Sequence, residues 1–208
     1  LDDEPLLADA MLAAGFSLAA KPGTWARHAV QIDLLVPEAV SGAGRRSARL
    51  GPHGTEVARK AKGLEAAIVD HDLFTIAALD PADTRTVEVA IAGLAALMVA
   101  KLHKLAERED TPARWSPKDG LDVLRILQGA DLPQVGATLA ALEAHTVAGA
   151  VTSESRTLLR RLFGTRSAHG AAMAVQASVG IEEPATIAGA CAALTAELLL
   201  AWEAGLVR

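Results

Sequence analysis

The chain has 208 residues, of which 51% are hydrophobic, and its formal net charge is −5 at pH 7. This length is enough for one large domain or two small ones, and the high hydrophobic fraction excludes an intrinsically disordered protein. The negative charge argues against a general nucleic-acid coat protein, because such proteins are basic.

Cysteine content and hydropathy indicate the compartment. The single cysteine, Cys191, cannot form an internal disulfide and lies in an Ala/Leu-rich stretch, so we expect a buried thiol in a reducing environment. Of the longest apolar stretches, 91–100 is too short to cross a membrane and 188–201 contains Glu197. We therefore expect a cytoplasmic protein with no membrane partner.

The first third of the chain predicts one helix and one strand before a loop. Residues 4–14 place apolar side chains at helical spacing, with Pro5 in the first turn and Gly15 as the stop. Residues 29–36 are apolar and β-branched, which predicts a strand. The Gly-rich residues 41–54 show no period and predict a loop.

The remaining elements become helical towards the C-terminus. Residues 66–69 and 86–91 predict two more short strands. Periodic apolar residues then predict helices at 93–109, 117–128, 132–146, 152–163, 168–178 and 184–205. The sequence thus predicts an α+β protein, with a small mixed β-sheet part at residues 1–92 and a C-terminal helical bundle at 93–208.

Asp33 is a carboxylate on a strand that is otherwise largely apolar. A strand fixes the direction of its side chains, as a magnesium ligand requires. The alternative is that Asp33 lies on the solvent-facing side of the strand.

Lys101 lies in an apolar helical stripe. On a helical wheel it falls among Leu94, Leu97, Met98, Leu102 and Leu105, with Arg108 near the edge, while His103, Lys104 and Glu107 point elsewhere. A lysine in such a stripe either extends its ammonium to water or serves a site. The sequence leaves both interpretations open.

Two carboxylates open the next predicted helix. Ser116 as N-cap, Pro117 at the first helical position and Asp119 as the reciprocal capping acid explain this helix start. Asp122 then remains, one turn later on the same face. Together the two carboxylates could hold a cation, orient Lys101 or accept a proton.

A basic segment spans residues 45–62. It contains six cations and one acid, Glu56. Either it is a solvated loop and helix start, or it faces a phosphate or an RNA. Its cations are Arg45, Arg46, Arg49, Arg59, Lys60 and Lys62.

Three stretches in order resemble the later motifs of bacterial toxin-type nucleotidyltransferases, the AbiEii-like group of the nucleotidyltransferase superfamily. They are IDLLVP at 32–37, ALMVAKLHKLAERED at 96–110 and KDGLDVLRIL at 118–127. The resemblance covers residues 5–128. It implies a nucleotidyltransferase-like N-terminal part.

The resemblance also implies roles for individual residues. Asp33 would be a metal-binding or base-type carboxylate, Lys101 the nucleotide-phosphate lysine and Arg108 its helical partner. Asp119 and Asp122 would form the following acidic pair. Lys118 stands where the group has arginine; it keeps the charge but not the two-pronged donor.

One family signature has no counterpart in these 208 residues: the Gly-Ser turn followed by a strand with two carboxylates spaced D-x-D. Two functions are therefore expected as alternatives. The first is magnesium-dependent transfer of a nucleotide from an NTP to an RNA or protein acceptor, received by segment 45–62. The second is a non-catalytic protein that binds a nucleotide or a protein partner.

An antitoxin and a second copy of the chain are further candidate partners, the latter because the helices after residue 130 are unusually apolar.

Overall fold

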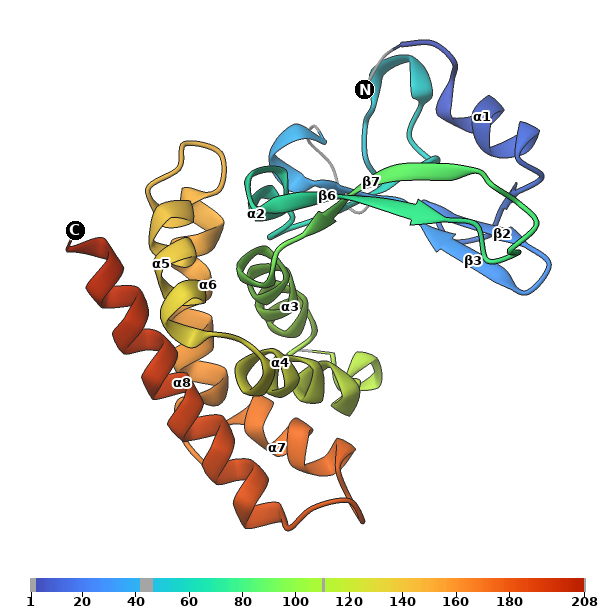
Figure 1. Cartoon of the computed structure of the whole chain (residues 1–208). Coiled ribbons are helices and arrows are strands. Elements are labelled where there is room, and N and C mark those ends of the chain that lie inside the picture. Colours follow the sequence, from blue (N-terminus) through green and yellow to red (C-terminus); the bar gives the residue numbers. More distant parts are fainter. Residues whose placement is uncertain (1–2, 42–46, 110, 208) are drawn as a thin grey trace. The chain divides into compact units, whose positions relative to one another are not determined.

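The computed structural model describes residues 3–41, 47–109 and 111–207, which divide into two compact units at residues 1–64 and 65–208 (Figure 1). Each unit has a core of its own. In chain order the elements are α1 (Leu7–Ala13), β1 (Ser17–Leu18), β2 (Thr24–Arg27), β3 (Val30–Asp33), β4 (Leu35–Pro37), β5 (Arg59–Ala61), α2 (Glu65–Val69), β6 (His71–Ala77), β7 (Thr86–Ala92), α3 (Leu94–Arg108), α4 (Pro117–Gly129), α5 (Leu132–Glu143), α6 (Gly149–Phe163), α7 (His169–Ala177) and α8 (Pro184–Leu206), with short 3-10 turns at 38–40, 51–53 and 112–114. The predicted α+β class is therefore confirmed.

The N-terminal unit is built on two small sheets. Strands β1, β2 and β3 are antiparallel neighbours, and β4 pairs with β5 in parallel. Trp25 is the largest side chain of the core, and its indole Nε1 donates a 2.9 Å hydrogen bond to the carbonyl of Val57. This bond satisfies the polar edge of a ring that is otherwise packed against apolar neighbours.

The strand predicted at residues 29–36 is two strands in two different sheets. At the break, the amide of Leu34 donates to Gly23 O at 2.7 Å, and Leu34 O accepts from the amide of Arg59 at 3.0 Å. Gly23 has φ +73, and a Cβ there would lie 2.7 Å from the Arg59 nitrogen. Only glycine fits this crossing point, where the chain leaves one sheet for the other.

The C-terminal unit is a helical bundle. Its core is formed by apolar side chains of α3 to α8, among which Trp202, Phe163 and Met98 are fully buried. The long helix α8 runs beside α5, and α7 packs against α4 (Figure 1). All six helices predicted from residue 93 onward are confirmed, with ends displaced by a few residues at most positions.

The strand predicted at residues 66–69 is wrong, because this segment is the short helix α2. Ala66 is fully buried in the helical core, and its carbonyl accepts a 2.8 Å hydrogen bond from the amide of Asp70. The strand lies directly after it, as β6, which pairs antiparallel with the correctly predicted β7. A short apolar run does not distinguish a strand from a buried helical turn.

The hairpin of β6 and β7 belongs to the helical unit, because the chain divides into its two compact units between residues 64 and 65, whereas the sequence had suggested a division between 92 and 93. Asp70 provides the link: its carboxylate accepts from the amide of Ala96 at 2.8 Å and its carbonyl from the amide of Gly93 at 2.9 Å. These bonds join the base of the hairpin to the first turn of α3.

Every residue of both strands of this hairpin is exposed. The register pairs Phe74 with Val89 and Ile76 with Val87, and Ile91 lies on the same face because side chains alternate along a strand. The hairpin therefore presents a continuous apolar face.

Helix α8 is the one helix among the described residues that is long and apolar enough to cross a membrane, judged by length and composition. A third of its most apolar stretch is buried in the bundle. Such a helix is also typical of the core of a soluble protein.

Substitution of Gly120 tests the close packing of α4 on α7. A Cβ at Gly120 would lie 2.7 Å from the carbonyl oxygen of Gly170 and 2.9 Å from the amide of Ala174. Because backbone atoms cannot move aside easily, we expect Gly120→Ala to lower the free energy of unfolding by about 1–3 kcal/mol in urea denaturation.

Gly129, at the end of the same helix, is the matched control, since a Cβ there meets nothing within 4 Å. Gly129→Ala should be neutral or stabilising by about 0.5–1 kcal/mol. Equal losses in the two variants would contradict the packing described for Gly120.

Candidate functional site

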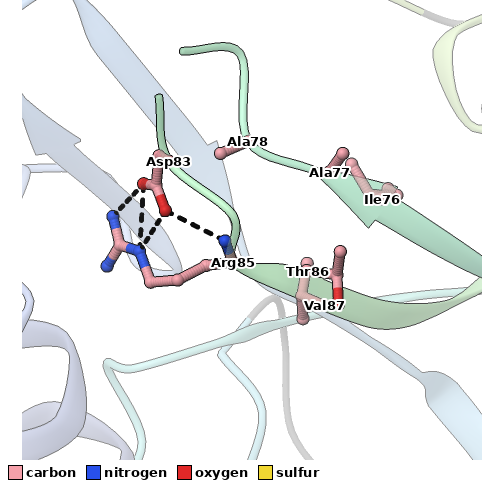
Figure 2. A pocket seen from close by; sticks show the side chains of 7 residues that line it. All are labelled: Ile76, Ala77, Ala78, Asp83, Arg85, Thr86 and Val87. Atoms are coloured by element: carbon pink, nitrogen blue, oxygen red, sulfur yellow. Dashed lines mark hydrogen bonds and ion pairs between the residues drawn. The ribbon is translucent and has the colours of Figure 1, made fainter. Parts of the chain in front are cut away.

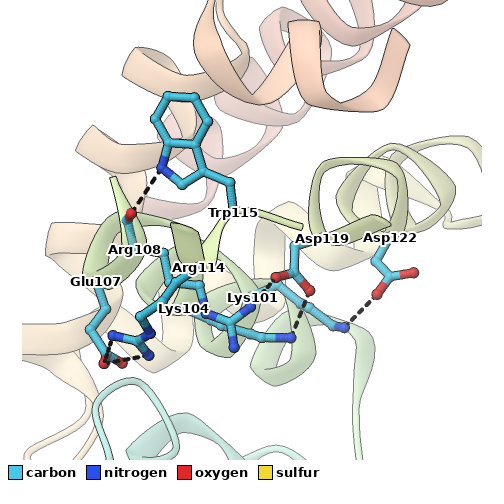
Figure 3. Close-up of polar contacts among 8 residues, drawn as sticks. All are labelled: Lys101, Lys104, Glu107, Arg108, Arg114, Trp115, Asp119 and Asp122. Carbon is cyan, nitrogen blue, oxygen red and sulfur yellow. Dashed lines mark hydrogen bonds and ion pairs between the residues drawn. The ribbon is translucent and has the colours of Figure 1, made fainter. Parts of the chain in front are cut away.

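Three cations on one side of α3 face two carboxylates of α4. Lys101 Nζ donates to Asp122 Oδ2 at 2.7 Å, Lys104 Nζ to Asp119 Oδ1 at 2.6 Å, and Arg108 Nη1 to Asp119 Oδ2 at 2.6 Å (Figure 3). We call the three cations the basic face of α3. They recur at helical spacing, so they form one row along the helix.

The apolar side of α3 positions this row. Met98, Leu102 and Leu105 are buried in the bundle core, whereas Leu94 and Leu97, which we predicted in the same stripe, are exposed. The buried stripe is therefore rotated relative to the prediction. As a result the basic face lies at the edge of the core, where ammonium groups reach partners on α4.

Asp119 is the most buried member of the cluster, with 5% of its side chain exposed. Ser116 is the N-cap and Pro117 the first helical residue, as predicted, but the expected capping box does not form. The carboxylate of Asp119 turns instead to Lys104 and Arg108. A buried carboxylate requires such compensation, because isolated charge is costly in the interior.

Asp122 lies one turn further along α4. Burial alone would raise its pKa, but the hydrogen bond from Lys101 and the charges of Lys101, Lys118 and Arg125 outweigh burial and hold the pKa below its usual value. Lys118 is exposed and acts on Asp122 through its charge. Asp122 is therefore an anion at neutral pH and neutralises part of the basic face.

Trp115, in the connection between α3 and α4, lies next to the cluster. Its Nε1 donates to the carbonyl of Arg108 at 3.0 Å (Figure 3) and to the carbonyl of Glu109 at 3.2 Å, and its ring meets that of His169 edge-on with centroids 4.5 Å apart. The indole satisfies carbonyls at the end of α3, which have no partner within the helix. It thereby fixes the path of the chain from α3 to α4.

Asp33, at the end of β3 in the N-terminal unit, has partners of its own. Its carboxylate accepts from the hydroxyl of Thr24 at 2.6 Å and forms an ion pair with Arg59 at 3.4 Å. The hydrogen bond from Thr24 lowers the pKa of Asp33 most, burial opposes it, and the charges of Lys21 and Arg59 add to the decrease. Asp33 is thus ionised, with a cation already beside it.

The structure brings together most of the residues predicted for the C-terminal unit. Lys101 pairs with Asp122, one of the two carboxylates expected to orient it, and Arg108 pairs with Asp119, a contact that was not predicted. Lys104 was wrongly assigned to another face; its recurrence in one row with Lys101 and Arg108 was the signal that could have revealed it. Asp33 belongs to the other unit, and its partners Thr24 and Arg59 were not predicted.

The basic segment 45–62 is only partly a loop. Arg45 and Arg46 lie outside the described residues, and Arg49 is exposed. Residues 59–61 form β5 rather than the start of a helix, because they pair with β4. Arg59 is directed to Asp33, so it is not an unpaired cation of this segment.

The described carboxylates do not gather into a site for a resident magnesium ion. Within the described ranges, no three His, Cys, Asp or Glu side chains lie close enough together to hold a metal ion. Asp33 offers one carboxylate, whose oxygens bond Thr24 and Arg59. Magnesium needs six oxygen ligands, so a single carboxylate leaves the rest to water and substrate.

Two other features are poor candidates for chemistry. Cys191 is fully buried, and burial raises the pKa of its thiol to about 11, so it is not a nucleophile at neutral pH. A shallow depression at the far end of the hairpin contains one charged pair, Asp83 and Arg85, and these two bond each other (Figure 2).

Comparisons of the chain with protein families, with curated proteins and with solved structures find no match.

Removal of the Asp119 carboxylate should destabilise the helical unit. Asp119→Ala leaves Lys104 and Arg108 without their partner in a half-buried position, and we expect a loss of about 2 kcal/mol in the free energy of unfolding. The control is Asp83→Ala, which removes the surface ion pair with Arg85 and should cost clearly less stability. Equal effects would show that burial of Asp119 is unimportant.

Acid titration should reveal the pair of Lys101 and Asp122. Because the pKa of Asp122 is depressed in the folded state, the stability it contributes is complete above the ordinary value of 3.8 and is lost as the pH falls through the folded pKa. In urea unfolding between about pH 6 and pH 2, the stability difference between wild type and Asp122→Asn should shrink below about pH 4. A constant difference over this range would contradict the assignment.

Proposed function

We propose that the chain is a nucleotidyltransferase-like protein and that the basic face of α3 binds the phosphates of a nucleoside triphosphate. The row of Lys101, Lys104 and Arg108 against Asp119 and Asp122 carries this proposal. Three cations meet two carboxylates, so the cluster retains positive charge. The resemblance in the sequence supplies the class of ligand.

The hydrogen-bonding capacity of the basic face supports an anionic ligand. A lysine ammonium has three donors, and in the described part of the chain Lys101 and Lys104 each use one in a side-chain bond. The Nε of Arg108 is buried and has no acceptor among the described residues. Donors left over at a cluster of cations favour phosphate oxygens, which form strong charge-assisted hydrogen bonds.

Transfer of the nucleotide to an RNA or protein hydroxyl, with magnesium, is the reaction that the resemblance implies. When bound, magnesium would neutralise charge that develops on the phosphates. In that reaction Asp33 would be the carboxylate that holds the metal or accepts a proton, Lys101 would stabilise the leaving pyrophosphate, and segment 45–62 would receive the acceptor. The described carboxylates do not form a magnesium centre.

Binding without transfer is the second candidate function. It is favoured by the contacts of Asp33, whose carboxylate bonds the hydroxyl of Thr24 and pairs with Arg59. In the described part of the chain, no group of three possible metal ligands includes it. The function would then be to bind a nucleotide or a protein partner, with no reaction following. An antitoxin and a cytoplasmic location remain predictions from the sequence.

Calorimetric titration with each NTP, with and without magnesium, tests the phosphate-binding proposal. We expect Lys101→Gln to weaken binding at least about tenfold, because one charge-assisted hydrogen bond contributes about 1.5–3 kcal/mol. Inorganic triphosphate serves as a second ligand, since it retains the phosphates and lacks the base.

Two further variants make the result specific. Arg85→Gln also removes one positive charge, but from an exposed position at the end of the hairpin, and should leave the affinity unchanged. The double variant Lys101→Gln/Asp122→Asn leaves no unpaired carboxylate and keeps a hydrogen-bonding pair, so a folding defect is avoided. No NTP binding by wild type, or equal binding by Lys101→Gln, would contradict the proposal.

A further inference from the structure

The outer side of α8 is an apolar face that nothing in the described residues covers. Ala193, Ala196, Leu200 and Val207 recur at intervals of three, four and seven residues, so they lie on one side of the helix. Leu200 is 69% exposed and Val207 is 88% exposed. The opposite side of α8 packs on α5, leaving this one at the outside of the bundle (Figure 1).

Two more large apolar side chains are exposed just before the start of the helix. Val179 and Ile181, in the connection that leads into α8, are 75% and 81% exposed. Large exposed side chains thus stand at both ends of α8, with small alanines in between. Small residues at the centre of a helix face allow a second helix to approach closely.

Charges on α8 argue for a protein partner rather than a lipid. Glu197 and Glu203 flank the apolar row and are exposed; Glu203 bonds Arg160 of α6 at 3.1 Å. A face buried in lipid would carry two carboxylates into the hydrocarbon, which is expensive. The same carboxylates at the rim of a helix pair remain in water.

Arg166 supplies a complementary charge near the other half of the helix. Its guanidinium nitrogen lies 3.8 Å from the position that a Cβ of Gly189 would take, so it stands beside the first part of α8. Arg166 and Glu197 are both exposed, and neither forms an ion pair within the described residues. When two copies of α8 pack antiparallel, the cation beside the first half of one helix faces the anion on the second half of the other. The charges of the two copies are therefore complementary.

We propose that α8 is the interface between two copies of this chain, packed antiparallel about a two-fold axis near residue 194. In this arrangement Ile181 of one copy meets Val207 of the other, and Arg166 of one copy lies within one helical turn of Glu197 of the other. Ala193 and Ala196 lie at the axis. A two-fold interface is self-complementary, which is the property that this face has.

Sedimentation equilibrium over a range of concentrations tests the proposal on the full chain. Wild type should form a dimer, and Leu200→Glu should be monomeric, because each copy would bury an unpaired carboxylate in the apolar interface. Leu200 is already 69% exposed in one copy, so the variant should keep its helical circular dichroism. A monomeric wild type at every concentration would overturn the proposal.

Charge exchange identifies the partner as a second copy. Glu197→Arg and Arg166→Glu should each weaken the dimer about tenfold, since each places like charges opposite one another. The double variant Glu197→Arg/Arg166→Glu should restore wild-type association. A double variant as weak as the single ones, or a wild-type monomer that binds phosphatidylcholine vesicles instead, would overturn the proposed antiparallel pairing.

Discussion

The arrangement of α3 and α4 depends on one buried carboxylate. Asp119 is almost completely enclosed, so its charge must be neutralised by partners that reach it from α3. Lys104 and Arg108 do so from positions one turn apart, which restricts both the distance and the rotation between the two helices. Once these are fixed, the next turn of α4 places Asp122 opposite Lys101.

The candidate site is consequently part of the bundle and not an addition to it. The same row of side chains borders the apolar core on one side and carries positive charge on the other. Substitution of Lys104 or Arg108 would therefore change both the stability of the bundle and the binding of a ligand. Lys101 pairs with the less buried Asp122, so its substitution is best suited to change binding alone.

Helices were largely predictable from the sequence, and strand pairing was not. The helices after residue 93 repeat apolar residues over several turns, a long signal that few other structures satisfy. Residues 66–69 are too few to show a hydrophobic period. Strand β6 was not predicted, because its pairing with β7 depends on hydrogen bonds between strands. The division of residues 29–36 between two sheets depends on Gly23, which approaches Leu34 from another part of the unit.

The candidate site was predictable to a similar degree. Lys101 stood out in an apolar stripe and Asp122 as a carboxylate that helix capping does not need, and the resemblance added Arg108. The structure places these residues in ion pairs across α3 and α4. Thr24 and Arg59 could not be assigned to Asp33, since they come from neighbouring segments and no local spacing links them. The rotation of α3 that brings in Lys104 follows from which apolar residues the bundle buries, a property of the whole fold.

The three tryptophans lie in three different environments, which makes each a separate fluorescent probe. Trp25 is buried in the N-terminal unit, Trp202 is buried in the helical unit, and Trp115 is 44% exposed beside the basic face. The chain contains no tyrosine, so these three indoles supply its near-ultraviolet emission. Variants that keep one tryptophan at a time would report the unfolding of each unit separately, and the emission of Trp115 would follow events at the junction of α3 and α4.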